Sequence, residues 1–331
     1  MTVLVTGGAG YIGSHMVREL IDAHEKVVVV DNLTTGFRWA VAPEASLVVG
    51  DIGDQDLVKT VIEKHAVNAI IHFAGSVVVP ESVADPLGYY LNNTVKSRAL
   101  IETAVKTGVK NLIFSSTAAV YGNPVEIPVT ETAIPAPMSP YGSSKLMTEI
   151  MLKDTSLAHD FHYTALRYFN VAGADPQGRT GQSTKGATHL IKVACETALG
   201  KRGHIDVFGT DYPTRDGTCI RDYIHVTDLV RAHTAALAYL RKGGTSDIFN
   251  VGYSKGYSVL EVLDSVKRVS GKSFDVRLAP RRPGDPASIV AGSAKIRSTL
   301  HWEPKHDDLD AIVRQALAWE VKLAERLKKT G

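Results

Sequence analysis

The sequence predicts an α/β protein in which a doubly wound parallel sheet is followed by a smaller α/β lobe. Three observations indicate this fold class. Strand-like and helical patterns alternate through the first half, a glycine cluster follows the first strand, and the alternation loses regularity after Arg167. The 331 residues also exceed a typical single domain, so a second, smaller unit is expected.

The first unit of the fold lies at the N-terminus. Apolar residues 3–5 and 27–30 predict two strands. Between them, apolar residues recur at the spacing of one helix face, at Ile12, Met16, Val17 and Leu20. Residues 57–62 then predict a helix, and 69–71 and 111–114 predict further strands. Such apolar strands suit a parallel sheet covered on both faces.

A loop and a helix complete the first unit. Residues 122–140 contain five prolines and almost no periodicity, so they predict a surface loop. This loop leads into a helix that carries Tyr141. We therefore assign residues 1–170 to the sheet domain.

Residues 171–331 are expected to form the smaller lobe. Segment 225–242 carries an apolar helical stripe, so segment 225–251 is expected to pack back against the main sheet. Residues 308–328 predict a last helix, with acidic residues at its start and basic residues at its end, as the helix dipole favours.

Composition indicates a globular protein without a nucleic-acid or membrane partner. Hydrophobic residues make up 44%, charged residues 22%, and the net charge is only +2. The N-terminus shows neither a charged leader nor a long apolar stretch, which favours a cytoplasmic location. The two cysteines, Cys195 and Cys219, are expected to be reduced and buried.

The glycine cluster has the context of a dinucleotide site. Gly7, Gly10 and Gly13 follow a predicted strand, and Tyr11 and Ile12 lead into the helix after it. Backbone amides of such a turn can approach a pyrophosphate at the helix N-terminus. The fold class is therefore a Rossmann-type doubly wound parallel sheet. A tight turn without any ligand is the alternative.

Two carboxylates follow the next strands. Asp31 closes the second strand, where it can accept hydrogen bonds from both adenosine ribose hydroxyls, and Asn32 rather than an arginine comes next, which favours NAD over NADP. Asp51, beside Ile52, is expected to position the adenine or, alternatively, to cap the following helix.

Tyr141 and Lys145 are the candidate catalytic pair. Their i, i+4 spacing places phenol and ammonium side by side on one helix face. A nearby cation and the first turn of a helix both lower a phenol pKa, which is normally about 10, and so create a base. Thr117, at a strand end, can relay a proton. The alternatives are an exposed helix pair and a solvated strand end.

Arginines of the second lobe are candidate diphosphate ligands. Planar guanidinium groups suit phosphate oxygens, and Arg221, Arg281 and Arg282 are available. Surface ion pairing is the alternative, particularly for Arg281. The twelve histidines show no metal-ligand spacing, so no metal site is expected.

Eight motifs together resemble the extended short-chain dehydrogenase/reductase family, and within it the nucleotide-sugar 4-epimerases. They lie at residues 6–15, 31–33, 50–52, 72–75, 139–145, 167–170, 208–212 and 221–226. The resemblance implies an NAD cofactor, a UDP-hexose substrate, and interconversion of UDP-glucose and UDP-galactose through a 4-keto sugar.

The resemblance also implies which residues act. Catalysis would fall to Thr117, Tyr141 and Lys145. NAD would be bound by Gly7, Gly10, Tyr11, Ile12, Gly13, Asp31, Asn32, Asp51, Ile52, Phe73, Ala74, Gly75, Asn92, Ser115, Tyr141, Lys145 and Tyr168. The nucleotide sugar would be bound by Thr117, Tyr141, Asn170, His189, Leu190, Phe208, Arg221, Arg282, Asp285 and Ile289.

The sequence departs from the family pattern at three positions. Thr117 replaces a serine, His189 an asparagine, and Val77 a lysine near the NAD phosphates. Related 4,6-dehydratases carry an acidic pair where this chain has Ala118 and Ala119, and two methyl groups cannot remove water from a sugar.

Substrate and assembly stay open at this point. Ile289 aligns with the residue that limits substrate size in the family, and UDP-N-acetylhexosamines, UDP-pentoses and UDP-uronates are alternative substrates. A non-catalytic NAD-binding sensor is a further alternative. The resemblance implies a homodimer formed through helices near residues 93–106 and 143–158.

Overall fold

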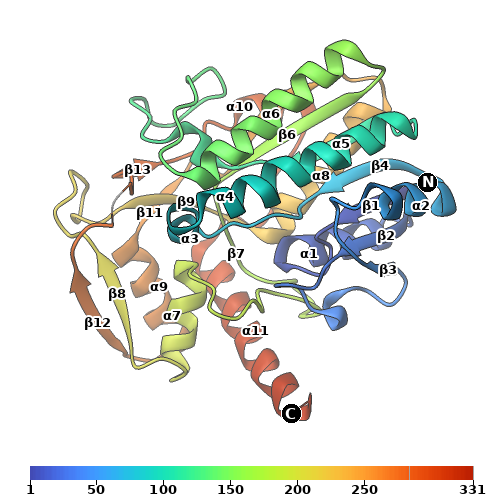
Figure 1. Ribbon diagram of the computed structural model, residues 1–331. Coiled ribbons are helices and arrows are strands. Elements are labelled where there is room, and N and C mark those ends of the chain that lie inside the picture. Colours follow the sequence, from blue (N-terminus) through green and yellow to red (C-terminus); the bar gives the residue numbers. More distant parts are fainter. Residues whose placement is uncertain (283, 331) are drawn as a thin grey trace.

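A seven-stranded parallel sheet forms the centre of the computed structural model, which describes residues 1–282 and 284–330. Figure 1 shows this sheet with helices packed around it. The strand order is β10-β6-β5-β4-β1-β2-β3, and neighbouring strands pair in parallel. The strands are β1 (Thr2–Thr6), β2 (Lys26–Asp31), β3 (Ser46–Val49), β4 (Val67–His72), β5 (Asn111–Ser115), β6 (His162–Tyr168) and β10 (Asp247–Val251). The predicted fold class is confirmed.

Helices cover both faces of this sheet. They are α1 (Tyr11–Asp22), α2 (Gln55–His65), α5 (Lys96–Lys106), α6 (Pro140–Ala158) and α8 (Val226–Arg241). Side chains along a strand alternate between faces. Val3 and Val5 therefore pack in one core cluster with residues of α1 and α8, whereas Leu4 packs in another with residues of α2 and α5. This double burial explains the continuous apolar strand sequences.

A long helical run made of three consecutive segments lies beside α6. It comprises α4 (Pro86–Tyr89), the π-helical turn η2 (Tyr90–Val95) and α5, and it is preceded by α3 (Val79–Ala84). Two short 3₁₀ helices, η1 (Arg38–Ala40) and η3 (Ala118–Tyr121), follow β2 and β5. Residues 122–139 form no helix or strand apart from a bridge between Val129 and Ala291, in agreement with the predicted loop.

Most of the remaining elements gather on one side of the main sheet (Figure 1). In one small sheet, β9 pairs in parallel with β7 and β13 and antiparallel with β11; in another, β8 pairs with β12. The strands are β7 (Asn170–Ala172), β8 (His204–Phe208), β9 (Ile220–His225), β11 (Gly256–Ser258), β12 (Asp275–Ala279) and β13 (Ser288–Ile289). The helices are α7 (Leu190–Ala198), α9 (Val259–Ser270), α10 (Ala294–Leu300) and α11 (Leu309–Thr330).

The chain returns to the main sheet with α8 and β10, and again with α10, which packs against both. Helix α8 packs against α1, and β10 pairs with β6 as the edge strand. The boundary proposed after residue 170 falls within the short strand β7, directly after its first residue, and the division into two domains stays a proposal.

Candidate active site

The glycine turn between β1 and α1 has a backbone that larger residues could not adopt. Gly7 has φ 70°, and a Cβ atom there would lie 2.7 Å from the backbone nitrogen of Ala74. A Cβ atom on Gly13 would lie 2.1 Å from the carbonyl oxygen of Gly7. No side chain caps α1 at Gly10, so the first amides of the helix, near Tyr11 and Ile12, can face an anion. The turn fits a dinucleotide pyrophosphate.

Asp31 lies directly beside this turn. Its carboxylate accepts hydrogen bonds from the amides of Ala9, at 2.9 Å, and Leu33, at 2.8 Å. Because a carboxylate has about four acceptor positions, both oxygens can still accept ribose hydroxyls. Asn32 instead forms a local turn with Thr34.

Asp51 does not cap the next helix, so that alternative is wrong. Asp54 caps α2 by accepting the amide of Leu57 at 3.0 Å. Asp51 accepts the amide of Gly53 at 2.8 Å and pairs with Lys96 at 2.5 Å. The carboxylate is thereby held at the carboxyl edge of the sheet, after β3, next to Ile52.

Turn η2 holds the segment after β4. The Asn93 side chain accepts the Ser76 amide at 2.7 Å and donates to the Ser76 carbonyl at 3.0 Å, and Asn92 donates to the Ser76 hydroxyl at 2.9 Å. These bonds fix the backbone after Phe73, Ala74 and Gly75. A π-helical turn at this place matches the frequent occurrence of such turns at functional sites.

The three candidate catalytic residues meet at the carboxyl edge of β5. Tyr141 and Lys145, in the first two turns of α6, are 7% and 3% exposed, so the alternative of an exposed helix pair is wrong. Thr117 shares a side-chain hydrogen bond with Tyr141. The Lys145 ammonium donates to the carbonyl of Ser115 at 3.1 Å, and the Ser115 hydroxyl bonds the Tyr168 hydroxyl at 2.5 Å.

Burial reverses the pKa shift that the sequence predicts for Tyr141. Removal from water raises the pKa of the Tyr141 phenol, and the hydrogen bond with Thr117 offsets this only in part. Burial lowers the pKa of Lys145 to about 8, against the opposing effect of Glu149. The predicted lowering of the phenol pKa by Lys145 is therefore wrong for the protein alone, because desolvation exceeds the favourable effects.

Four predicted nucleotide-sugar ligands come together in the second lobe. Arg221, on β9, donates to the Pro286 carbonyl at 2.8 Å and lies 3.5 Å from the Asp285 carboxylate. The Arg282 guanidinium lies 3.7 Å from the ring centre of Phe208, at the end of β8. The amide of Asp285 donates to the carbonyl of Arg282, which joins the two pairs.

Arg281 takes no part in this group. It donates to the Asp211 carboxylate at 2.7 Å and lies 4.2 Å from the Tyr212 ring centre, with an exposed side chain. The alternative of a surface ion pair therefore describes Arg281, whereas its neighbour Arg282 points to Phe208.

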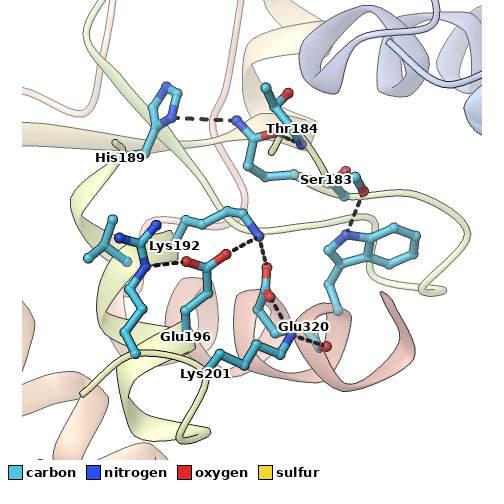
Figure 2. A network of polar contacts seen from close by, with 12 residues as sticks. Ser183, Thr184, His189, Lys192, Glu196, Lys201 and Glu320 are labelled. Carbon is cyan, nitrogen blue, oxygen red and sulfur yellow. Dashed lines mark hydrogen bonds and ion pairs between the residues drawn. The ribbon is translucent and has the colours of Figure 1, made fainter. Parts of the chain in front are cut away.

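His189 and Leu190 stand at the start of α7, beside a pocket that Tyr11 also lines. Gln182 donates to the His189 ring at 3.5 Å (Figure 2). The Tyr11 hydroxyl donates to the Gly173 carbonyl at 2.7 Å. The pocket thus lies between the glycine turn and the start of α7.

Ion pairs fix α7 to α11, and two of their members, Lys192 and Glu320, also line this pocket (Figure 2). Lys192 pairs with Glu196 at 3.0 Å and also with Glu320 of α11. Lys201 pairs with Glu320 at 2.8 Å. Sequence reasoning missed these residues: the i, i+4 spacing of Lys192 and Glu196 is a local signal, whereas the pairs with Glu320 join distant parts of the chain and leave none.

Asn170 and Ile289, the last two residues predicted to bind the nucleotide sugar, lie near the sheet edge that carries the catalytic residues. Asn170 begins β7, two residues after Tyr168. Ile289, on β13, packs in a small core cluster that includes Ala118, Tyr121 and Phe169. Ile289 thus contacts the cluster that contains η3, which starts directly after Thr117.

Within the described part of the chain, no group of three or more His, Cys, Asp or Glu side chains could hold a metal ion. No helix within those residues is long and apolar enough to cross a membrane.

A glycine turn for a dinucleotide and a buried Thr, Tyr and Lys at the same sheet edge define a nicotinamide-dependent enzyme of the short-chain dehydrogenase/reductase class. More narrowly, the chain belongs to the NAD dependent epimerase/dehydratase family, whose sequence model matches residues 3–252.

Three similar proteins are 4-epimerases of UDP-sugars. A UDP-glucose 4-epimerase from Azospirillum brasilense is 54% identical over 99% of this chain and 94% of its own length. A UDP-glucose 4-epimerase from Brucella ovis, solved in complex with NAD, is 44% identical, with a TM-score of 0.93, over 96% of this chain and 97% of its own. A UDP-Glc/GlcNAc 4-epimerase from Campylobacter jejuni is 49% identical, with a TM-score of 0.85, over 97% of this chain and 99% of its own.

Proposed function

We propose that this enzyme interconverts UDP-glucose and UDP-galactose with NAD as its cofactor. The observation that carries the proposal is the burial of Tyr141, with Thr117 and Lys145, at the sheet edge that also presents the glycine turn. Near full-length similarity to UDP-glucose 4-epimerases and to an NAD complex supports both substrate and cofactor.

The catalytic residues move a proton on the sugar. Tyr141 removes the proton of the hexose 4-hydroxyl, and Thr117, hydrogen-bonded to Tyr141, supports the transfer. NAD bound there would supply a reversible hydride acceptor for carbon 4, and the positive charge of its nicotinamide ring would favour the ionised phenol. Lys145, held by Ser115, adds a second positive charge at the site.

The second lobe holds the nucleotide. Arg221 and Arg282 bind the diphosphate, while Phe208 and Asp285 order the two guanidinium groups. Because these contacts fall on UDP rather than on the hexose, a 4-keto sugar can turn over between the two hydride transfers. Return of the hydride to the other face of carbon 4 would then give the epimer.

An N-acetylated UDP-hexose is a second candidate substrate. The 49% identity to a UDP-Glc/GlcNAc 4-epimerase favours it. Ile289, of intermediate size, would limit the space beside η3. The 4,6-dehydratase activity lacks support, because η3 begins with Ala118 and Ala119.

A homodimer is part of the proposal. Leu87, Leu91 and Val95 lie on one face of the run from α4 to α5 and are 78%, 54% and 52% exposed. On the neighbouring helix α6, Met147, Ile150 and Leu157 are also exposed. Contiguous apolar surface on two adjacent helices is typical of a protein interface. A second copy of this chain would cover both helices.

A cytoplasmic location is also proposed, supported by the two unpaired cysteines, Cys195 and Cys219.

The proposal is tested by incubating the purified protein, supplied with NAD, with a panel of UDP-sugars. We expect UDP-galactose to yield UDP-glucose, with the reverse reaction from UDP-glucose. UDP-N-acetylgalactosamine, a UDP-pentose and a UDP-uronate complete the panel. Conversion of only one of these, with UDP-galactose unchanged, would reassign the substrate, and conversion of none would support the non-catalytic sensor.

A further inference from the structure

The side-chain amide of Asn250, on edge strand β10, is buried, and both its oxygen and its nitrogen form hydrogen bonds. Asn250 is 0% exposed. Its carbonyl oxygen accepts the Tyr121 hydroxyl at 2.7 Å, and its amide donates to the Val129 carbonyl at 2.9 Å. A buried amide with both ends paired fixes the segments that it joins. Here these segments lie before and within the loop of residues 122–139.

Tyr121 ends the short helix that Thr117 begins. The Thr117 hydroxyl accepts the Ala119 amide at 3.1 Å and so caps η3. Beyond Tyr121 the chain enters the loop, where Gly122 has φ 64° and Val125 is fully exposed. The hydroxyl of Tyr121 is therefore a polar anchor between the catalytic turn and a loop that runs out to the surface.

The start of the same turn is tied to the catalytic helix. The Ser116 hydroxyl donates to Glu149 at 2.5 Å, and Glu149 lies one turn after Lys145 on α6. Arg167 donates to the Glu149 carboxylate at 3.0 and 2.6 Å, and its guanidinium lies 4.8 Å from the Tyr121 ring centre. One buried chain of contacts thus runs from α6 through Arg167 and Tyr121 to β10.

We propose that Tyr121 and Asn250 are positioning residues for the reaction, which hold the turn at Thr117 so that its hydroxyl meets Tyr141. The inference rests on the proposed roles of Thr117 and Tyr141. Thr117 and Tyr121 stand at the two ends of η3, which makes about one helical turn. Loss of the Tyr121 hydroxyl frees one end of η3 and so displaces the Thr117 hydroxyl at the other end. A displacement of about 1 Å from a productive geometry can cost about a hundredfold in rate.

Tyr121→Phe is the decisive variant, because it keeps the ring that packs on Arg167 and removes only the hydroxyl. We expect its kcat with UDP-galactose to fall by about tenfold to a hundredfold, with KM and bound NAD unchanged. Asn250→Ala, which removes the acceptor, should show the same split between kcat and KM. Tyr239→Phe is the matched control, because it removes a phenol hydroxyl that bonds Thr245 at the end of α8, and it should retain wild-type kcat.

A double-variant cycle separates positioning from general destabilisation. If Tyr121 acts through Thr117, adding Tyr121→Phe to Thr117→Val should change kcat by less than about twofold. The inference would be overturned if the losses of kcat in the two single variants multiplied in the double variant. It would also be overturned if the kcat of Tyr121→Phe stayed within about twofold of the wild-type value. An inactive wild-type protein would instead overturn the proposed function, and this inference with it.

Discussion

At the scale of single residues, Tyr141 is subject to opposing physical effects. Burial raises the pKa of its phenol, and the hydrogen bond with Thr117 lowers it. The ammonium of Lys145 is committed to the Ser115 carbonyl, and burial lowers the pKa of Lys145 to about 8. The site therefore provides an ordered but largely neutral phenol until positive charge is added by the oxidised cofactor.

Tyr141→Phe should abolish most of the turnover and keep the fold. The variant removes the proton acceptor and leaves the ring in place, so kcat should fall by about a hundredfold to ten-thousandfold. Steady-state kinetics with UDP-galactose and the NAD released on denaturation measure the two properties. Loss of bound NAD together with activity, or turnover near that of the wild type, would contradict the assigned base.

Residue spacing predicted the partners at this site but not their energetics. The i, i+4 pair at Tyr141 and Lys145 follows from helix geometry, and the role of Gly7 follows from its place between strand and helix. The pKa direction depends on how deeply α6 buries the phenol, which spacing does not contain. The bond from Lys145 to Ser115 likewise depends on the packing of α6 against β5.

At the scale of elements, the run from α4 to α5 presents an apolar stripe that the chain itself leaves uncovered. Leu87, Leu91 and Val95 are spaced by four residues and so share one helix face. Helix α6 lies alongside and adds Met147 and Ile150. Two such helices from each of two copies would give a four-helix interface.

Leu91→Glu should convert the proposed dimer into a monomer. A carboxylate in the middle of the stripe would be desolvated in the interface, which is strongly unfavourable. Light scattering coupled to gel filtration measures the mass, and Leu199→Glu, at an exposed leucine just after α7, is a matched control. A wild-type protein that is already a monomer, or a variant that stays a dimer, would contradict the proposed interface.

Regular elements were predictable from sequence, and long-range pairing was not. Apolar runs indicate β1, β2, β4 and β5 because parallel strands are buried on both faces. The ion pair between Lys192 and Glu320 joins residues 128 positions apart, and the bond between Tyr121 and Asn250 joins residues 129 apart. Neither pair has a local pattern, because each partner is an ordinary polar residue on its own element.

At the scale of the whole molecule, several buried histidines link the fold to pH. Burial lowers the pKa of His15, His225 and His233 from 6.5 to about 4, and that of His72 to about 3. Between pH 6.5 and 4, the unfolded chain therefore binds more protons at these groups than the folded protein. Their contribution to stability is complete above pH 6.5 and is lost as the pH falls.

Unfolding in urea should accordingly require less denaturant at pH 5 than at pH 7.5. Three carboxyls act in the opposite direction, since burial raises the pKa of Asp222 to about 6 and also raises the pKa of the partly exposed Glu19 and Asp307, but the four histidines outweigh them. Fluorescence-detected urea titrations at the two pH values measure the midpoints. An equal or higher midpoint at pH 5 would show that these histidines are not buried in the neutral form.

The central claim joins both units of the molecule: Tyr141 takes a proton while carbon 4 of the sugar exchanges a hydride reversibly with NAD. The most direct measurement uses UDP-galactose carrying deuterium at carbon 4, converted by the enzyme in ordinary water, with the UDP-glucose product examined by mass spectrometry and NMR. Retention of deuterium at carbon 4 is the predicted result, because the hydride returns from the cofactor without exchange with solvent. Replacement of the deuterium by solvent hydrogen would contradict the account.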